Sequence, residues 1–462
     1  MKHAGLSGDS GKGKKLVRIL ERYRQEHVLE HIGRLSGRKK DRFIKEASAL
    51  DLKLVLDLYS EISRGRPSRP GYARIDPPRV YRPTESGVNG MLSGMGETSI
   101  GKGENGVLIV AGGQATRLRY PYPKGMYPVT PVKKKSLFML LSEKVRAVSL
   151  RYGADIPLLI MTNPESDILV KRYFEKNGFF GLGRKNVLFF QQELLPSVSP
   201  GGKLVIREDG LLASSPDGHG GCLKAAFKSG VAGKLKERGI RRLFYCHVDN
   251  PLVKVLDPLF LGYHLRSEAD FSLKTVRKRP GEKVGTFLYA DGKAAVVEYI
   301  ELNEVLDERG SSHAVEAFDS GSIGVHLIEL SFMESLFFKS GGLPYHRQEK
   351  ELQIEGGKRI GIWKFETFIF DAIPFAGKVS CMETSREEEF APLKNFSGMD
   401  SPRDVREAMS SLHRKWLTSA GIRVKKKTEV EISPLFALDE SDFARKMKGR
   451  KLLLQGKSLY IE

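Results

Sequence analysis

Cysteine and long apolar segments are both scarce in this chain. Its 462 residues contain three cysteines, and these are far apart: Cys222, Cys246 and Cys381. An odd, widely spaced set argues against a disulfide framework, and the absence of a CxxC pair argues against a zinc site held by thiolates. No segment approaches about 18 consecutive apolar residues, and the first residues, MKHAGLSGDSGKGKK, lack the apolar stretch of a signal peptide. We therefore expect a cytoplasmic protein with no membrane span.

Acidic residues are outnumbered by basic ones, 56 to 76, so the net charge is +20. This excess favours anionic partners such as nucleotides, sugar phosphates or nucleic acid. Solvated surfaces explain the short basic runs at 133–135, 277–279 and 425–427 equally well. None of these runs alternates with aromatic residues, as single-strand binding requires, so the pattern does not favour nucleic acid.

The chain is long enough for two or three domains, and it contains four segments that differ in composition and hydrophobic pattern. Residues 1–63 are predicted to form a helical N-terminal region, since Leu52, Val55, Leu56 and Tyr59 share one helix face. Residues 64–105, rich in proline and glycine, are predicted to be a linker or arm that is extended rather than helical. The remaining predicted segments are 106–385, a catalytic domain, and 386–462, a small C-terminal domain with a helix at Leu412–Ala420 and a terminal hairpin around Gln455–Lys457.

Strand and helix patterns alternate from Val107 onward, with helices expected at Lys135–Tyr152 and Asp167–Lys176. This rhythm predicts an α/β fold in which a mainly parallel central sheet carries helices on both faces. Ligands of such sheets bind at the carboxyl ends of the strands. The predicted strands are Val107–Val110, Pro157–Thr162, Val187–Gln191, Arg242–His247, Phe271–Val276, Gly285–Tyr289 and Ala294–Tyr299.

The run Val107–Pro131, VLIVAGGQATRLRYPYPKGMYPVTP, carries the strongest functional signal. A short β-branched strand leads into small residues, whose backbone can approach a ligand closely and direct N–H groups at an anion. Two cations, Arg117 and Lys124, follow within a few residues. The ordered pattern favours a nucleoside triphosphate over a plain strand-to-helix turn.

Two further segments contain residues suited to the same ligand. Ser215–Gly221, SPDGHGG, is a glycine-dense loop before a helical run from Leu223, and it suits either a base or ribose contact or a simple helix entry. Asp249 follows a predicted buried strand, where a carboxylate could hold a magnesium ion that bridges phosphates or form a turn before Pro251.

Lys394 is the single lysine in the run REEEFAPLKN, where it could reach a phosphate or form a surface ion pair. No Ser-His-Asp arrangement is readable, and His219, His247 and His326 lack the spacing of metal ligands. We therefore predict no protein nucleophile.

Together these segments resemble the eukaryotic-type UDP-N-acetylhexosamine pyrophosphorylases, within the wider family of UDP-sugar pyrophosphorylases, or UTP–glucose-1-phosphate uridylyltransferases. The resemblance covers roughly residues 25–435, and its motifs occur in the family's order. They include AGGQATRL and YPKGMYPV (111–129), IMTNPES (160–166), VLFFQQELLPSV (187–198), SPDGHGG (215–221), YCHVDNPLVKVLDPLFLG (245–262), FETFIFDAIPFA (365–376) and REEEFAPLKN (386–395).

The resemblance implies a Rossmann-like fold of the nucleotide-diphospho-sugar transferase type. The implied reaction joins UTP and N-acetylglucosamine 1-phosphate to give UDP-N-acetylglucosamine and diphosphate, with Mg²⁺ or Mn²⁺. In it a sugar phosphate oxygen attacks the α-phosphorus in line, so cations act by positioning and charge neutralisation.

The resemblance also assigns roles to individual residues. Ala111, Gly112 and Gly113 would hold the nucleotide by their backbone, while Gln192, Gly218 and His219 would contact the base. Arg117, Lys124 and Lys394 would bind phosphates and act in catalysis, and Asp249 would bind the metal. The sugar would be contacted by Gly285, Glu298, Ser322, Phe368 and Phe370.

Four positions, in three segments, depart from the family pattern. The family has Asn at the position of His219 and Asn at the position of Ser322, and usually glycine at the positions of Ala115 and Arg119. Ser322 leaves the choice of sugar open, so a UTP–glucose-1-phosphate uridylyltransferase or a broad UDP-sugar pyrophosphorylase is an alternative. A second alternative is a catalytically inactive relative that binds nucleotides or nucleic acid, although the presence of Arg117, Lys124, Asp249 and Lys394 argues against it.

Overall fold

The computed structural model describes residues 11–64, 72–83, 87–113, 115–279, 281–298, 302, 317–339, 342–354, 357–450 and 457–462. The chain divides into two compact units. The first comprises Met1–Gly71, Gln192–Gly221 and Leu343–Ile369, and the second comprises Tyr72–Gln191, Cys222–Gly342 and Phe370–Glu462. Among the described residues, no helix has the length and apolar character needed to cross a membrane.

The second unit is built on a mixed sheet of ten strands, counted over the described residues. Four neighbouring strands run parallel, in the order β7 (Arg242–His247), β2 (Asn105–Val110), β3 (Leu158–Thr162) and β4 (Val187–Gln191). Every residue of β2 and β3 is buried, as expected for parallel strands covered by helices on both faces. The predicted α/β class is confirmed.

A mainly antiparallel extension continues this sheet beyond β7. The strand β11 (Ser320–Glu329), which the sequence did not predict, pairs antiparallel with β7, β8 and β9. The predicted strand at 294–299 is shorter than expected, since β10 ends at Val297, and Tyr299 lies outside the described residues. The other strands of this extension are β1 (Ile75–Asp76), β8 (Phe271–Arg277), β9 (Thr286–Ala290), β10 (Lys293–Val297) and β14 (Val379–Glu383).

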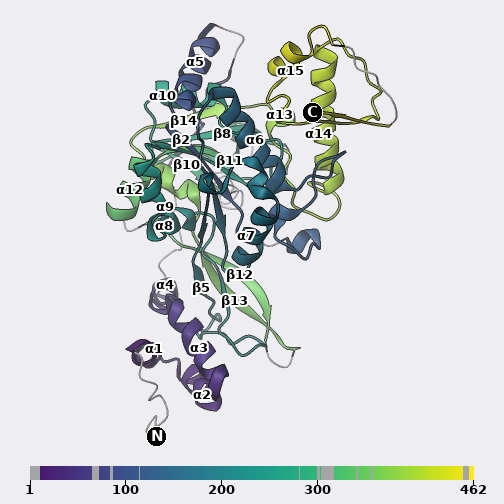
Figure 1. Cartoon of the computed structure of the whole chain (residues 1–462). Coiled ribbons are helices and arrows are strands. Elements are labelled where there is room, and N and C mark those ends of the chain that lie inside the picture. The colour runs from purple at the N-terminus through teal and green to yellow at the C-terminus, as the bar shows by residue number, and fades with distance from the viewer. Residues whose placement is uncertain are drawn as a thin grey trace. The chain divides into compact units, whose positions relative to one another are not determined.

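Helices flank the sheet of the second unit (Figure 1). The α6 helix (Leu137–Tyr152) begins where the Ser136 side chain accepts a hydrogen bond from the Met139 N–H, and it ends at Gly153 in the left-handed conformation. The bounds of α7 (Asp167–Lys176) match the prediction. The others are α8 (Gly221–Lys228), α9 (Val231–Glu237), α10 (Pro258–Arg266) and α12 (Leu330–Lys339).

The prediction that residues 64–105 are extended is wrong for their second half, which forms α5 (Gly87–Gly101). This helix crosses α10 at very short range at Gly96, and the two helices lie side by side in Figure 1. A Cβ atom on Gly96 would lie 2.0 Å from the carbonyl oxygen of Pro258, and one on Gly262 would lie 1.7 Å from that of Leu92. Composition alone suggested a linker, whereas close packing of two backbones explains Gly96 and Gly262. Pro67 and Pro70, in the first half, lie outside the described residues.

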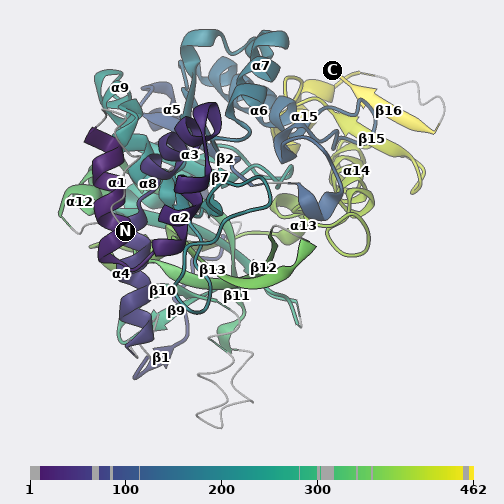
Figure 2. The same ribbon diagram turned by 90° about the horizontal axis from the view of Figure 1, so that it is seen from below.

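The C-terminal part of the second unit has a small hydrophobic cluster of its own, centred on Trp416, Leu417, Val430 and Phe443. Figure 2 shows its helices and strands gathered together in yellow-green and yellow. Residues 451–456, half of the predicted terminal hairpin, lie outside the described residues, and β16 pairs in parallel with β15. The elements are α13 (Arg386–Glu389), α14 (Pro402–Ser419), β15 (Glu429–Ile432), α15 (Glu440–Met447) and β16 (Ser458–Ile461).

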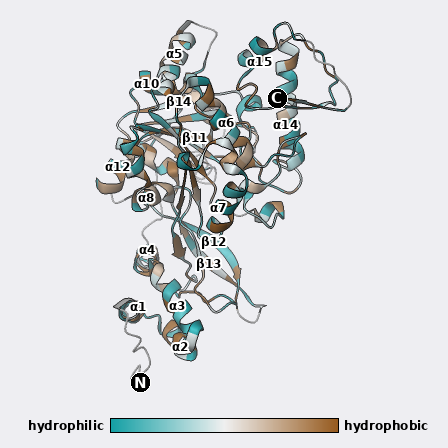
Figure 3. Ribbon diagram, in the orientation of Figure 1, coloured by the Kyte–Doolittle hydropathy of each residue, from teal (hydrophilic) through white to brown (hydrophobic). Residues whose placement is uncertain are grey.

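The first unit joins the N-terminal helices to two later segments of the chain. Its core combines Leu52, Val55 and Leu56 of the predicted helix face with Leu195 and Phe365. The outward residues of α3 are charged, and this helix is mostly teal in Figure 3. The elements are α1 (Gly11–Arg22), α2 (Glu26–Arg34), α3 (Gly37–Ala49), α4 (Leu52–Ser63), β5 (Leu194–Pro196), β6 (Ser214–Pro216), β12 (His346–Gln353) and β13 (Arg359–Glu366).

The helix crossing gives a stability prediction. Gly96→Ala should lower the free energy of unfolding by about 3 kcal/mol, because the added methyl group overlaps backbone atoms that cannot move aside cheaply. Gly94→Ala is the matched control on the same helix, where a Cβ meets nothing within 4 Å. The control should raise the free energy of unfolding by roughly 0.5–1 kcal/mol through helix propensity. Urea unfolding measures both, and equal effects would contradict the close crossing.

Candidate active site

The loop after β2 is fixed by the neighbouring strand β3 and the residues that follow it. The N–H of Ala111 donates to the Met161 carbonyl at 2.9 Å, which continues the β2–β3 ladder. The side-chain amide of Asn163 donates to the Gly112 carbonyl at 2.7 Å. Gly113 is exposed, and a Cβ atom added there would meet nothing within 4 Å. Of the three predicted nucleotide-binding residues in this loop, Gly113 is therefore best placed to approach a ligand.

Both predicted cations of this run lie on short 3-10 turns. Arg117 belongs to the turn Thr116–Leu118, and Lys124 begins the turn Lys124–Met126. The second turn is held by packing, because a Cβ atom on Gly125 would lie 2.2 Å from the Phe138 ring. The ammonium of Lys124 donates to the Asp249 carboxylate at 3.1 Å.

Asp249 follows the end of β7 and lies among cations. Burial acts to raise the pKa of its carboxyl group, but the charges of Lys124, His247 and Lys394 outweigh burial and hold the pKa below its ordinary value. The group is therefore ionised at neutral pH. The side chains of Lys124 and Asp249 retain 17% and 20% of their exposure, so both remain accessible.

Backbone hydrogen bonds bring Lys394 to the same place. The N–H of Leu393 donates to the Asp249 carbonyl at 2.8 Å, and the N–H of Phe396 donates to the Arg117 carbonyl at 3.1 Å. The segment that contains Lys394 is thus attached at two points to the loops of Asp249 and Arg117. The structure therefore brings together the four charged residues that were predicted at distant positions in the sequence.

The donor set near Asp249 suits magnesium. Among the described residues, no group of three or more His, Cys, Asp or Glu side chains could form a metal cage. Mg²⁺ usually binds proteins through one or two carboxylates together with substrate phosphates and water, so one ionised aspartate beside several cations that could bind phosphate fits its chemistry.

Three of the predicted sugar-contacting residues also come together in the second unit. The N–H of Ser322 donates to the Gly285 carbonyl at 2.8 Å. A Cβ atom on Gly285 would lie 2.7 Å from Val296 and 3.9 Å from the Glu298 carboxylate. Phe370, another predicted sugar contact, lies in the 3-10 segment Ile369–Phe375.

The predicted base-binding loop belongs to the first unit, where it packs against residues 366–369. Gly218 has a φ of +87°, and a Cβ atom there would lie 2.4 Å from the Thr367 carbonyl oxygen. The N–H of Gly220 donates to that carbonyl at 2.9 Å, and the N–H of Thr367 donates to the Asp217 carbonyl at 2.7 Å. Only glycine fits this contact, which explains the density of glycines. Gln192 lies in the same unit and is 5% exposed.

His219 and Phe368 are in contact with each other within this unit. His219 accepts a hydrogen bond at Nδ1 from the Ile369 N–H at 3.2 Å. The Phe368 ring stacks on His219 and on His346, with centroid distances of 5.3 and 4.8 Å. An asparagine Oδ1 could accept the bond that His219 accepts, which accounts for the exchange of these two residues relative to the family pattern.

One neighbour of Asp249 was not predicted from the sequence. His247 lies two residues before Asp249, and a Cβ atom on Gly324 would be 2.5 Å from its ring. Gly324 has a φ of +67° and lies where the β11–β8 register shifts, between Ser322 and His326. Side chains at positions i and i+2 of an extended segment share a face, and this spacing was the available signal.

Comparisons with known proteins show which family this chain resembles. The model of the UTP–glucose-1-phosphate uridylyltransferase family matches residues 103–457. UDP-N-acetylglucosamine diphosphorylase 1 of Arabidopsis thaliana is 33% identical, over 94% of this chain and 91% of its own. UDP-N-acetylglucosamine pyrophosphorylase of Saccharomyces cerevisiae is 34% identical, over 73% of this chain and 75% of its own. The crystal structure of the Trypanosoma brucei uridine diphosphate N-acetylglucosamine pyrophosphorylase in complex with inhibitor superposes with a TM-score of 0.81 at 25% identity, over 99% of both chains.

The role of His219 can be tested by substitution. His219→Leu removes the acceptor of the Ile369 N–H and should lower the free energy of unfolding by about 1–3 kcal/mol, while His219→Asn retains an acceptor and should cost much less. Thermal unfolding of the full chain compares the two variants. Equal losses of unfolding free energy in the two variants would show that the hydrogen bond from Ile369 is not what His219 contributes to stability.

Proposed function

The chain belongs to the UTP–glucose-1-phosphate uridylyltransferase family, and we propose that it joins UTP to N-acetylglucosamine 1-phosphate, with UDP-N-acetylglucosamine and diphosphate as products. The names of its relatives support the N-acetyl sugar. The observation that carries the proposal is the grouping of Lys124, Asp249 and Lys394 at the carboxyl ends of parallel strands.

The reaction needs charge neutralisation rather than a protein nucleophile. A phosphate oxygen of the sugar phosphate attacks the α-phosphorus of UTP, the bond to the β-phosphate oxygen breaks, and diphosphate leaves from the opposite side. Both reactants are anions that repel each other. Arg117 and Lys124 lie beside the strand-end loop and would bind the triphosphate, while Lys394 would bind the sugar phosphate.

We assign Asp249 to hold Mg²⁺ or Mn²⁺. A bound divalent cation would neutralise phosphate charge and orient the oxygens of the triphosphate. Lys124 now pairs with this carboxylate, and in the reacting protein it would exchange that contact for a phosphate oxygen. Asp249 would remain ionised in both situations because Lys394 and His247 also lower its pKa.

We further propose that Gln192 and the Gly218 backbone select uracil, because a mismatched base edge would leave buried polar groups unpaired. The sugar contacts are assigned to Gly285, Glu298 and Ser322, with Phe370 beside the N-acetyl group. Phe368 is stacked between two histidines and would act mainly by shaping the first unit.

We also place this reaction in the cytoplasm. None of the three buried cysteines forms a disulfide, as suits a reducing compartment.

The substrate proposal predicts that purified protein with UTP, Mg²⁺ and N-acetylglucosamine 1-phosphate releases diphosphate. Chelation with EDTA should stop release, and excess Mg²⁺ should restore it. Glucose 1-phosphate, tested in parallel, should be a poorer substrate in kcat/KM. A strong preference for glucose 1-phosphate would assign the chain to UDP-glucose synthesis. Both sugars are tested because Ser322 replaces the asparagine of the family pattern at a predicted sugar contact. No release with either sugar phosphate would refute the enzyme proposal.

The role of Lys124 gives a second prediction. Lys124→Ala should lower kcat by roughly 30- to 1,000-fold, equivalent to about 2–4 kcal/mol of transition-state stabilisation, because the phosphate charge loses a positioned cation. Lys176→Ala, which removes an exposed lysine of α7, is the charge-matched control and should leave kcat unchanged. Circular dichroism checks that both variants are folded. A folded Lys124→Ala variant with the activity of the control would remove Lys124 from the mechanism.

A further inference from the structure

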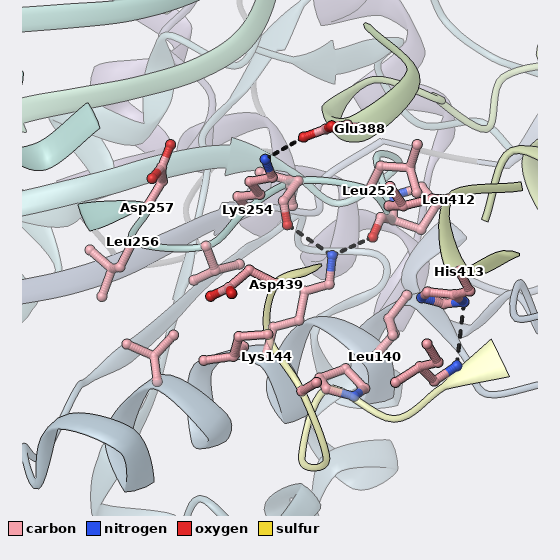
Figure 4. A pocket seen from close by; sticks show the side chains of 18 of the residues that line it. Leu140, Lys144, Leu252, Lys254, Leu256, Asp257, Glu388, Leu412, His413 and Asp439 are labelled. Carbon is pink, nitrogen blue, oxygen red and sulfur yellow. Dashed lines mark hydrogen bonds and ion pairs between the residues drawn. The ribbon is translucent and has the colours of Figure 1, made fainter. Parts of the chain in front are cut away.

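Lys144 of α6 binds the loop that follows Asp249. Its ammonium group donates hydrogen bonds to the carbonyl oxygens of Pro251 and Val253, at 2.6 and 2.8 Å. Figure 4 shows the Lys144 side chain extended across a cavity, with its nitrogen between these two oxygens. The cavity has a volume of about 110 Å³, and neither Asp249 nor Lys124 lines it. Lys144 therefore reaches the candidate active site through the backbone of the loop.

The same loop is bound on its other side by the segment that contains Lys394. The side-chain amide of Asn250 donates to the Glu389 carbonyl at 2.6 Å, and its oxygen accepts from the Ala391 N–H at 3.1 Å. The N–H of Leu393 donates to the Asp249 carbonyl. A shift of the 249–253 loop would therefore move the metal-binding carboxylate and the Lys394 segment together.

The charge of Lys144 suits this role. Burial lowers the pKa of its ammonium group to about 8, so most of the group is charged at neutral pH. A charged donor forms stronger hydrogen bonds to carbonyl oxygens than a neutral one. Removal of the donor would leave two carbonyl groups of the loop without their partner in a largely apolar surrounding.

We propose that Lys144 is a positioning residue of this enzyme, which fixes the 249–253 loop so that Asp249 is correctly placed relative to Lys124 and Lys394. The inference rests on the proposed function, because it concerns the geometry of that reaction. In-line transfer between two bound anions depends strongly on placement, and an error near 1 Å can cost about a hundredfold in rate. Lys144 acts only through the loop, so its loss should affect turnover more than substrate binding.

The test compares Lys144→Met, which keeps the aliphatic length, with Lys144→Arg, which keeps a charged donor. Lys144→Met should lower kcat by roughly 10- to 100-fold, with the KM for UTP changed by less than about threefold. Lys144→Arg should restore most of kcat, since the guanidinium group can donate to both carbonyls. Wild-type release of diphosphate, measured in the same series, tests the proposed function separately from Lys144.

Arg242→Met is the matched structural control. Arg242 is buried at the opposite end of β7, where it forms ion pairs with Glu329 and Glu104 at 2.5 and 3.2 Å. Its loss should lower the unfolding temperature and leave kcat of the folded protein unchanged. If Lys144→Met does not fold, Lys144→Gln takes its place in the series, because glutamine keeps a neutral donor. The kcat of Lys144→Gln should lie between that of the wild type and the value expected for Lys144→Met.

Three results would overturn the proposal. The first is a folded Lys144→Met or Lys144→Gln variant with kcat within twofold of the wild type. The second is a loss of kcat in Lys144→Arg as large as in Lys144→Met. The third is a loss of kcat in the folded Arg242→Met variant as large as that in Lys144→Met. General destabilisation of the fold would then explain the loss of kcat in both variants.

Discussion

The contact between the Lys124 ammonium and the Asp249 carboxylate is the constraint on which the candidate active site depends. Burial of this carboxylate acts to raise its pKa, because a low-dielectric surrounding disfavours its charge. The charges of Lys124, His247 and Lys394 outweigh burial and hold the pKa below its ordinary value, so an ionised carboxylate persists beside positive side chains. A site for two anions and a divalent cation would require charges of both signs at short range, and this contact supplies both before any ligand binds.

The fold meets this requirement by joining segments that are distant in the sequence. The parallel neighbours β2 and β7 end at the same edge of the sheet, so the loop of Gly112 and the carboxylate of Asp249 are brought together by strand pairing alone. Lys394 belongs to no strand. Its segment is attached by the hydrogen bonds of Leu393 and Phe396, and Phe390 and Leu393 are buried in the main core of the second unit.

The sequence allowed prediction of the parts that follow periodic rules. The strands at 107–110, 187–191 and 242–247 are apolar runs bounded by polar residues, and Asp249 could be placed at the ligand edge because parallel strands end together. The α5 helix was missed because its glycines lower the local helix propensity, whereas Gly96 packs against α10, a segment that is distant in the sequence. The roles of Lys144 and Asn250 were missed for a related reason, since a side chain that binds a distant backbone carbonyl leaves no pattern in its own neighbourhood.

The attachment of Lys394 also bears on how the reaction could proceed. A phosphate-binding lysine on an independent C-terminal domain would require that domain to close before the chemistry. Here Lys274, which is fully buried, pairs with Asp257 and Glu389 at 2.6 and 2.7 Å, and this ties the start of the 386–396 segment to the central sheet. Separation of a buried ion pair exposes an uncompensated charge and is costly, so this segment should stay in place. The geometry of Asp249 and Lys394 is therefore set within one unit, before either substrate binds.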